Sequence, residues 1–167
     1  MKRFILITAI LLGISAISLR IALFEVGVHN IPAFDDECKI SLQAKQIARG
    51  HFPLLILGSP YIFPLEAYLQ APIINFLPRN ALGARILDFG MGFLTIILSL
   101  IILRKWGSWK ETWPGIVLIL FPSGYLLMLQ VGCALPGYPT LMFLAVLVLW
   151  LAQRHAETER QSWIPAL

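Results

Sequence analysis

Charged side chains are scarce in this chain of 167 residues, where they make up 13% of the sequence, about half the share found in a soluble domain. Residues 112–153 carry none at all. This run of 42 residues is too long for one helical crossing of a bilayer whose apolar core is about 30 Å thick. A turn signature, Pro136-Gly137-Tyr138-Pro139, lies inside it. The scarcity of charge excludes a soluble globular protein and indicates a membrane protein.

The chain also lacks the motifs of the common soluble nucleotide enzymes. It has no Walker loop, no dinucleotide fingerprint and no nucleophile elbow. Its three histidines show no metal-ligand spacing, which argues against a zinc site. Cys38 and Cys133 could pair in an oxidising compartment, but two cysteines alone do not establish a bond. The net charge of +4 comes from basic residues beside apolar stretches rather than from a basic stripe, so nucleic acid is not an expected partner.

Hydropathy predicts an all-α membrane protein with a single transmembrane domain over residues 1–167. Four transmembrane helices are expected, at about residues 4–24, 86–103, 114–131 and 135–152. The first could instead be a cleaved signal peptide with its cleavage site near Ser15-Ala16, but its apolar stretch continues to Phe24 and is longer than a usual signal core. An uncleaved helix is therefore the favoured reading.

Basic residues flank the expected helices on one side only, if there are four helices. They are Lys2, Arg3, Arg104, Lys105, Lys110, Arg154 and Arg160. The positive-inside rule then places both termini in the cytoplasm and the segment 25–85 outside. Within the helices only Arg20 and Asp88 are ionisable, which is too few for the coupling site of a transporter. A structural ion pair between these two residues is conceivable.

The segment expected outside the membrane, residues 25–85, contains most of the acidic residues of the chain. Asp35, Asp36 and Glu37 precede an apolar pattern at helical spacing, and Gly50 follows as a C-terminal cap. This pattern predicts an amphipathic helix on the membrane surface. The three acids could simply stabilise its first turn. Alternatively, one could act as a general base or could coordinate a divalent cation such as Mg²⁺ or Mn²⁺.

A second acidic position, Glu66, lies in an apolar stretch of the same segment. Pro64 fits the first position of a helix there, and Pro72 closes it. Tyr61 and Tyr68 are residues of the type found at lipid headgroup level. Glu66 is either a helix cap or a carboxylate in a binding or catalytic cleft. Arg79 and Arg85 follow, and each could anchor the interface or grip a phosphate with a bidentate fork.

The order of these features resembles the N-terminal part of the GT-C membrane glycosyltransferases, the broad group that includes protein mannosyltransferases and aminoarabinose transferases. The matching stretches are Leu19-Arg20-Ile21, Asp36-Glu37, Gly50-His51-Phe52-Pro53, residues 65–72, Ala84-Arg85 and Gly137-Tyr138-Pro139. The stretch Gly137-Tyr138-Pro139 looks like the corresponding stretch of some bacterial members. The expected location is therefore a bacterial plasma membrane. The chain lacks the acid that many relatives carry before the fourth helix, and it lacks the family's C-terminal half.

The resemblance implies inverting transfer of a sugar from a polyprenyl-phosphate donor to an acceptor on the outer face of the membrane. It makes Asp36 the base or metal-positioning residue, with Glu37 and then Asp35 as further catalytic candidates. The candidates for substrate binding are Glu66, Tyr61, Tyr68, Arg85 and Tyr138. The chain would then be an N-terminal fragment of a transferase. The competing reading is a small four-helix membrane protein with a scaffolding or partner-binding role and no chemistry.

Overall fold

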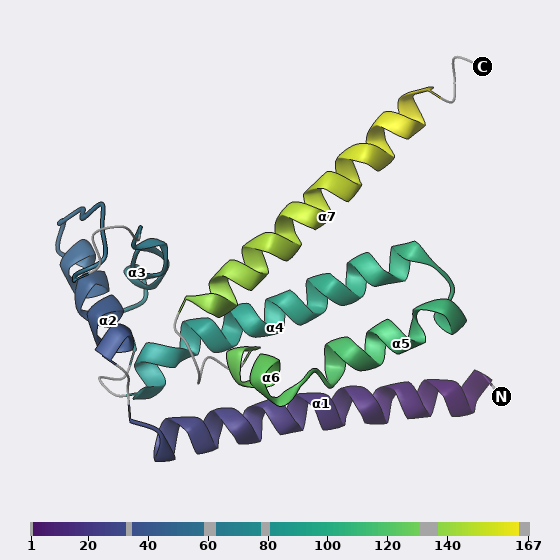
Figure 1. The fold of residues 1–167 in the computed structure, drawn as a ribbon, viewed down its shortest axis with the longest axis horizontal. Helices are drawn as coiled ribbons and strands as arrows, with labels where there is room; N and C mark the ends of the chain where they lie inside the picture. Colours follow the sequence, from purple (N-terminus) through teal and green to yellow (C-terminus); the bar gives the residue numbers. More distant parts are fainter. Residues whose placement is uncertain (1, 33–34, 59–62, 78–80, 131–136, 164–167) are drawn as a thin grey trace.

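The computed structural model describes residues 2–32, 35–58, 63–77, 81–130 and 137–163, and every regular element in these ranges is a helix (Figure 1). The elements are α1 (Lys2–Asn30), α2 (Asp35–Ala48), α3 (Leu65–Gln70), α4 (Ala81–Trp106), α5 (Trp109–Leu120), α6 (Gly124–Gln130) and α7 (Tyr138–Trp163). Three contain stretches long and apolar enough to cross a membrane, namely Ile7–Asn30, Arg85–Trp106 and Tyr138–Thr158. The chain is therefore an all-helical integral membrane protein, as its composition predicts.

Helix α4 lies at the centre of the bundle and contacts α1, α2, α5, α6 and α7 (Figure 1). Phe89 of α4 stacks on Phe24 of α1 with ring centroids 4.2 Å apart, and this pair forms the small apolar core between the two helices. Most large side chains of α1 face outward, Ile10, Leu11 and Ile14 among them. Outward apolar side chains are what a helix in contact with lipid tails presents.

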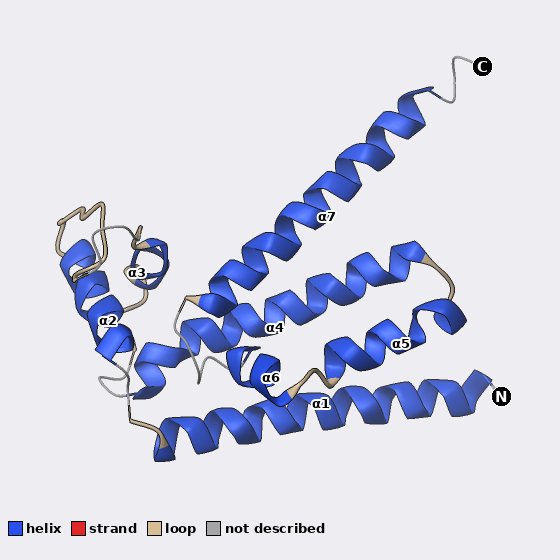
Figure 2. Cartoon of the chain, in the orientation of Figure 1, coloured by secondary structure: helices blue, strands red, loops and turns tan. Residues whose placement is uncertain are grey.

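The third expected membrane helix is not continuous. Helix α5 ends at Leu120 and α6 begins at Gly124, with a loop between them that Figure 2 shows in tan. Pro122 lies in this loop, and proline has no backbone N–H and clashes with the preceding helical turn. The expectation of one helix over residues 114–131 overlooked this proline. The start of α5 also lies earlier, where Glu111 Oε2 accepts a hydrogen bond from the Ser108 N–H at 2.7 Å.

Arg20 explains how the break between α5 and α6 is tolerated inside the bundle. Its guanidinium donates hydrogen bonds to the carbonyl oxygens of Leu120, at 2.8 Å, and Ile119, at 3.2 Å. These carbonyls belong to the last turn of α5, where no following turn supplies N–H partners. Arg20 is buried, and its described hydrogen bonds go to backbone carbonyls rather than to Asp88. It caps the interrupted helix instead.

Helices α2 and α3 pack against each other as a small unit. Ile40, Ala44 and Ile47 of α2 pack on a strip of α3 and the turns after it, which contains Ala67, Ala71 and Ile74. Helix α2 ends as predicted, because Gly50 adopts a left-handed conformation with φ of +91°. The expected exposure of the apolar face of α2 to the membrane surface is not observed, since α3 covers this face.

Two side chains hold the long connection between α2 and α3 in place. The Gln43 amide donates to the Leu55 carbonyl at 2.7 Å and accepts from the Leu57 N–H at 3.3 Å. The Tyr68 hydroxyl donates to the Pro53 carbonyl at 2.9 Å. These bonds tie residues 53–57 to α2 and α3 and give partners to three of their backbone polar groups.

Candidate functional site

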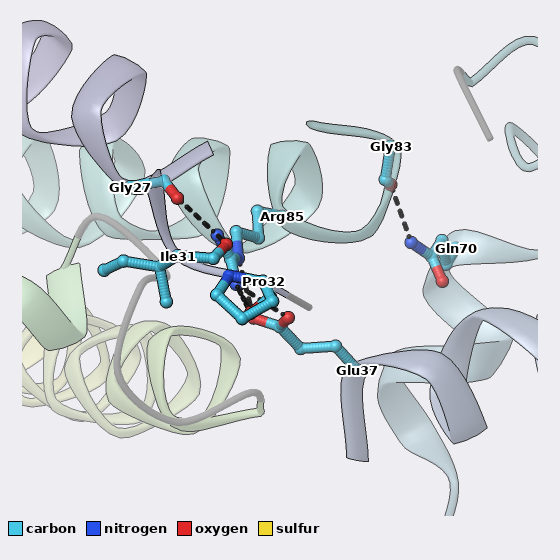
Figure 3. Close-up of polar contacts among 7 residues, drawn as sticks. All are labelled: Gly27, Ile31, Pro32, Glu37, Gln70, Gly83 and Arg85. Carbon is cyan, nitrogen blue, oxygen red and sulfur yellow. Dashed lines mark hydrogen bonds and ion pairs between the residues drawn. The ribbon is translucent and has the colours of Figure 1, made fainter. Parts of the chain in front are cut away.

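The centre of the candidate site is Arg85, near the start of α4, whose side chain is fully buried (Figure 3). Five of its hydrogen bonds go to described residues. Nε donates to Glu37 Oε1 at 2.8 Å and Nη2 to Glu37 Oε2 at 2.9 Å. The remaining three go to the carbonyl oxygens of Gly27, Ile31 and Pro32 at 2.8, 3.0 and 3.0 Å. Five bonds match the five N–H groups of a guanidinium.

This arrangement fastens three helix ends to one another. The carbonyls come from the end of α1 and the residues after it, Glu37 comes from the first turn of α2, and Arg85 comes from α4. A buried ion pair is stable only where further hydrogen bonds replace the lost water, and a planar guanidinium can make them in several directions at once. The structure thus brings together Arg85, a candidate phosphate contact, and Glu37, a candidate catalytic acid. Each side chain is engaged in the ion pair with the other.

Asp35 and Asp36, the other two acids of the triplet, lie at the surface of the same helical turn. Their side chains are 80% and 67% exposed. The Lys39 ammonium group contacts both, at 3.3 Å from Asp36 Oδ1, and its hydrogen bonds to Asp35 and Asp36 raise the pKa of Lys39. Of the three acids predicted as catalytic candidates, these two remain accessible to a ligand, and they lie beside a positive charge.

A second pair of acids lies where α3, α4 and α7 meet. The carboxyl groups of Glu66 in α3 and Asp88 in α4 are within hydrogen-bonding reach of each other, and the backbone N–H of Gly137 reaches Asp88. Both side chains are buried. Burial, with the adjacent charge of Asp88, raises the pKa of Glu66 to about 9. From the sequence, Glu66 is expected to be a helix cap or a carboxylate in a cleft, and Asp88 is considered only as a conceivable partner of Arg20. Nothing in the sequence indicates that α3 folds back on α4.

More buried polar side chains come from the same helix ends. Gln70, one turn after Glu66, donates to the Gly83 carbonyl at 3.1 Å (Figure 3). Within the described part of the chain, its Oε1 atom and Thr140 Oγ1 have no hydrogen-bond partner, and neither do Glu66 Oε2 and Asp88 Oδ1. Buried polar atoms without partners are uncommon in folded proteins and mark positions of functional interest.

The structure does not assemble a metal site from the candidate ligands. Among the described residues, no group of three or more histidine, cysteine, aspartate or glutamate side chains could hold a metal ion. Asp36 and Glu37, the proposed Mg²⁺ or Mn²⁺ ligands, lie apart because Glu37 faces Arg85 while Asp36 faces outward.

Two of the three tyrosine candidates lie among the described residues. Tyr68 is half-buried and its ring stacks on Phe63, with centroids 5.7 Å apart. Tyr138 is exposed at the first position of α7. Tyr61 lies outside the described residues, as do Arg79 and Cys133, while Cys38 is an exposed free thiol on α2.

The end of the bundle near α2 and α3 thus combines two exposed carboxylates, a buried ion pair and a buried carboxyl pair. No protein-family model, no curated protein and no solved structure matches the chain.

Proposed function

We propose that this chain is a membrane-embedded glycosyltransferase, or a part of one, that uses a polyprenyl-phosphate sugar as donor. The supporting observation is the position of Asp35 and Asp36, exposed on a helical turn that the Glu37–Arg85 ion pair fixes to α1 and α4. A catalytic carboxylate must be both accessible and rigidly held. The order of the sequence motifs supports the same assignment.

The proposed orientation places α2 and α3 outside a bacterial plasma membrane. The start of α1 and the end of α7 lie toward one side of Figure 1, with the turn between α4 and α5, while α2 and α3 lie at the other. Arg104 and Lys105 end α4 on the first side, which the positive-inside rule makes cytoplasmic. We infer that α5 and α6 together form a fourth, interrupted crossing that Arg20 stabilises at the break.

In the proposed reaction Asp36 acts as the general base. The acceptor hydroxyl or amine attacks the anomeric carbon of the donor sugar, and its proton passes to the Asp36 carboxylate. The bond between the anomeric carbon and the phosphate oxygen breaks, and polyprenyl phosphate leaves with the bonding electrons. Attack opposite the leaving group inverts the configuration of the sugar. The membrane supplies the lipid donor to the side where Asp36 is exposed.

The test measures consumption of the donor lipid. Membranes containing the protein are supplied with radiolabelled polyprenyl-phosphate mannose or aminoarabinose, and the release of polyprenyl phosphate is followed. Asp36→Asn should lower the rate by about 10²-fold or more, the typical contribution of a general base. Glu25→Gln, at an exposed acid near the outer end of α1, is the matched control and should leave the rate unchanged. A normal rate in the Asp36→Asn protein contradicts the proposal.

A non-enzymatic scaffold is the second candidate, and one observation favours it. Two of the outer acids, Glu37 and Glu66, are buried and serve contacts within the protein. If the outer segment only supports a partner protein, no donor lipid is consumed by the wild type. Asp36→Asn would then alter the recovery of a co-purifying partner without any change in lipid chemistry.

A further inference from the structure

The contact between Glu66 and Asp88 has a consequence that is independent of sugar transfer. The two carboxyl groups come from α3 and α4, are 6% and 1% exposed, and lie within hydrogen-bonding reach of each other. A Cβ atom added to Gly137 would lie 3.0 Å from Glu66 Oε2, so the start of α7 closes over the pair. If both Glu66 and Asp88 were ionised, their carboxylates would repel each other strongly, because they are adjacent and shielded from water.

The surrounding charges do not neutralise a doubly ionised pair. Helix α2 contributes Glu37 and α4 contributes Arg85, and these two already neutralise each other through a bidentate contact. Helix α7 contributes the Gly137 N–H and the positive end of its dipole, equivalent to about half a unit charge. Tyr138, the first residue of α7, is exposed. These groups can stabilise one negative charge, and the second carboxyl group then requires a proton.

We propose that Glu66 and Asp88 form a proton-binding site that holds one shared proton at neutral pH and thereby joins α3 to α4 and to the start of α7. With the proton in place, an O–H group of one carboxyl donates to the other, as in known carboxyl pairs that share a proton. Loss of the proton at alkaline pH leaves two adjacent negative charges. Helix α3 and the start of α7 then separate from α4.

The separation would extend to the outer segment, because α3 packs on α2 through Ile40, Ala44 and Ile47. Asp35 and Asp36 lie on the first turn of that helix. The proton site therefore links the pH on the outer side of the membrane to the position of the exposed carboxylates. The same link holds whether these carboxylates take part in transfer or in binding a partner.

Infrared spectroscopy tests whether the proton is present. The whole protein is reconstituted in lipid bilayers, and spectra are recorded from about pH 6 to about pH 10, a range that spans the titration of a strongly shifted carboxyl group. The wild type should show the carbonyl band of a protonated, buried carboxylic acid at neutral pH and should lose it at alkaline pH. Glu66→Gln should remove this band, Asp88→Asn should shift or remove it, and Asp35→Asn, at an exposed acid, should leave it unchanged.

Hydrogen exchange tests the structural consequence in the same samples. Amides of α3 and of residues 138–141 should exchange at least about tenfold faster in the wild type than in Glu66→Gln at alkaline pH, and equally at about pH 6. Comparison at equal pH removes the intrinsic pH dependence of exchange. A wild type without the protonated-acid band at neutral pH overturns the proposal, as does a band that both variants leave unchanged. Equal exchange of these amides in the wild type and in Glu66→Gln at every pH overturns the proposed separation of α3 and the start of α7 from α4.

Discussion

Arg85 and Glu37 form a bidentate ion pair in which both side chains are buried, with Nε–Oε1 and Nη2–Oε2 distances of 2.8 and 2.9 Å. The pair joins the first turn of α2 to the start of α4, and the remaining guanidinium donors bind the end of α1. Its geometry divides the acidic triplet into one acid that holds the fold together and two acids that face outward.

Breaking this ion pair from one side should destabilise the protein severely. Arg85→Met removes the buried counter-charge of Glu37 and Glu37→Met removes that of Arg85, and each should cost about 3–5 kcal/mol. The double variant should cost far less than the sum, because no buried charge is left without a partner. Thermal unfolding followed by tryptophan fluorescence in lipid nanodiscs measures all three. Additive losses would show that the two side chains do not depend on each other.

Arg20 should be needed because the helix is interrupted at Pro122. Arg20→Met removes the hydrogen bonds to the Ile119 and Leu120 carbonyls, which are partly buried, and the loss of each bond should cost about 1 kcal/mol. Pro122→Ala restores a backbone N–H and lets α5 continue toward α6. The loss caused by Arg20→Met should therefore be smaller when Pro122→Ala is also present. The same unfolding measurement applies, and an equal loss in both backgrounds would refute the capping role.

Gly137 should tolerate a side chain less well than Gly50, although both have positive φ, at +82° and +91°. Alanine in a left-handed conformation costs about 1 kcal/mol at either position. At Gly137 the added Cβ also meets Glu66 Oε2 at 3.0 Å, whereas at Gly50 it meets nothing within 4 Å. Gly137→Ala should lower the unfolding temperature more than Gly50→Ala. The excess should vanish in a Glu66→Ala background, and its persistence there would exclude the Glu66 contact as the cause.

Stability should fall as the pH rises, because of Glu66. Its pKa is about 9 in the folded protein, raised from 4.5 by burial and by the charge of Asp88. Above about pH 4.5 the unfolded chain has released this proton while the folded chain still holds it. Each rise in pH from there to about pH 9 therefore lowers the free energy of unfolding. The unfolding temperature of the wild type should decline across this window relative to Glu66→Gln. If the unfolding temperatures of the two proteins changed with pH in parallel, the raised pKa of Glu66 would be contradicted.

Much of the fold can be predicted from the sequence, because apolar length and helix-ending residues act locally. The helix from Asp35, its end at Gly50 and the helix after Pro64 form where the pattern indicates. The third membrane helix was predicted wrongly as continuous because hydropathy averages over Pro122, whose effect on the backbone does not depend on polarity.

The candidate site was less predictable because its contacts are distant in the sequence. Glu37 and Arg85 are 48 residues apart, and the Glu66–Asp88 contact depends on α3 folding back onto α4. The sequence does show isolated charges in apolar surroundings, Arg20, Glu66 and Asp88, and all three are buried with polar contacts. Which groups they contact follows only from the packing of the helices.

The most direct test of this division of roles compares Asp36→Asn with Glu37→Gln, two adjacent and nearly isosteric changes. The unfolding temperature of each purified protein is measured against the wild type in the same lipid nanodiscs. Asp36→Asn should change stability by no more than about 0.5 kcal/mol, as expected at an exposed site. Glu37→Gln should cost about 3 kcal/mol or more, because Arg85 loses its buried counter-charge. Equal effects of the two substitutions would contradict the assignment of Glu37 to the fold and Asp36 to the surface.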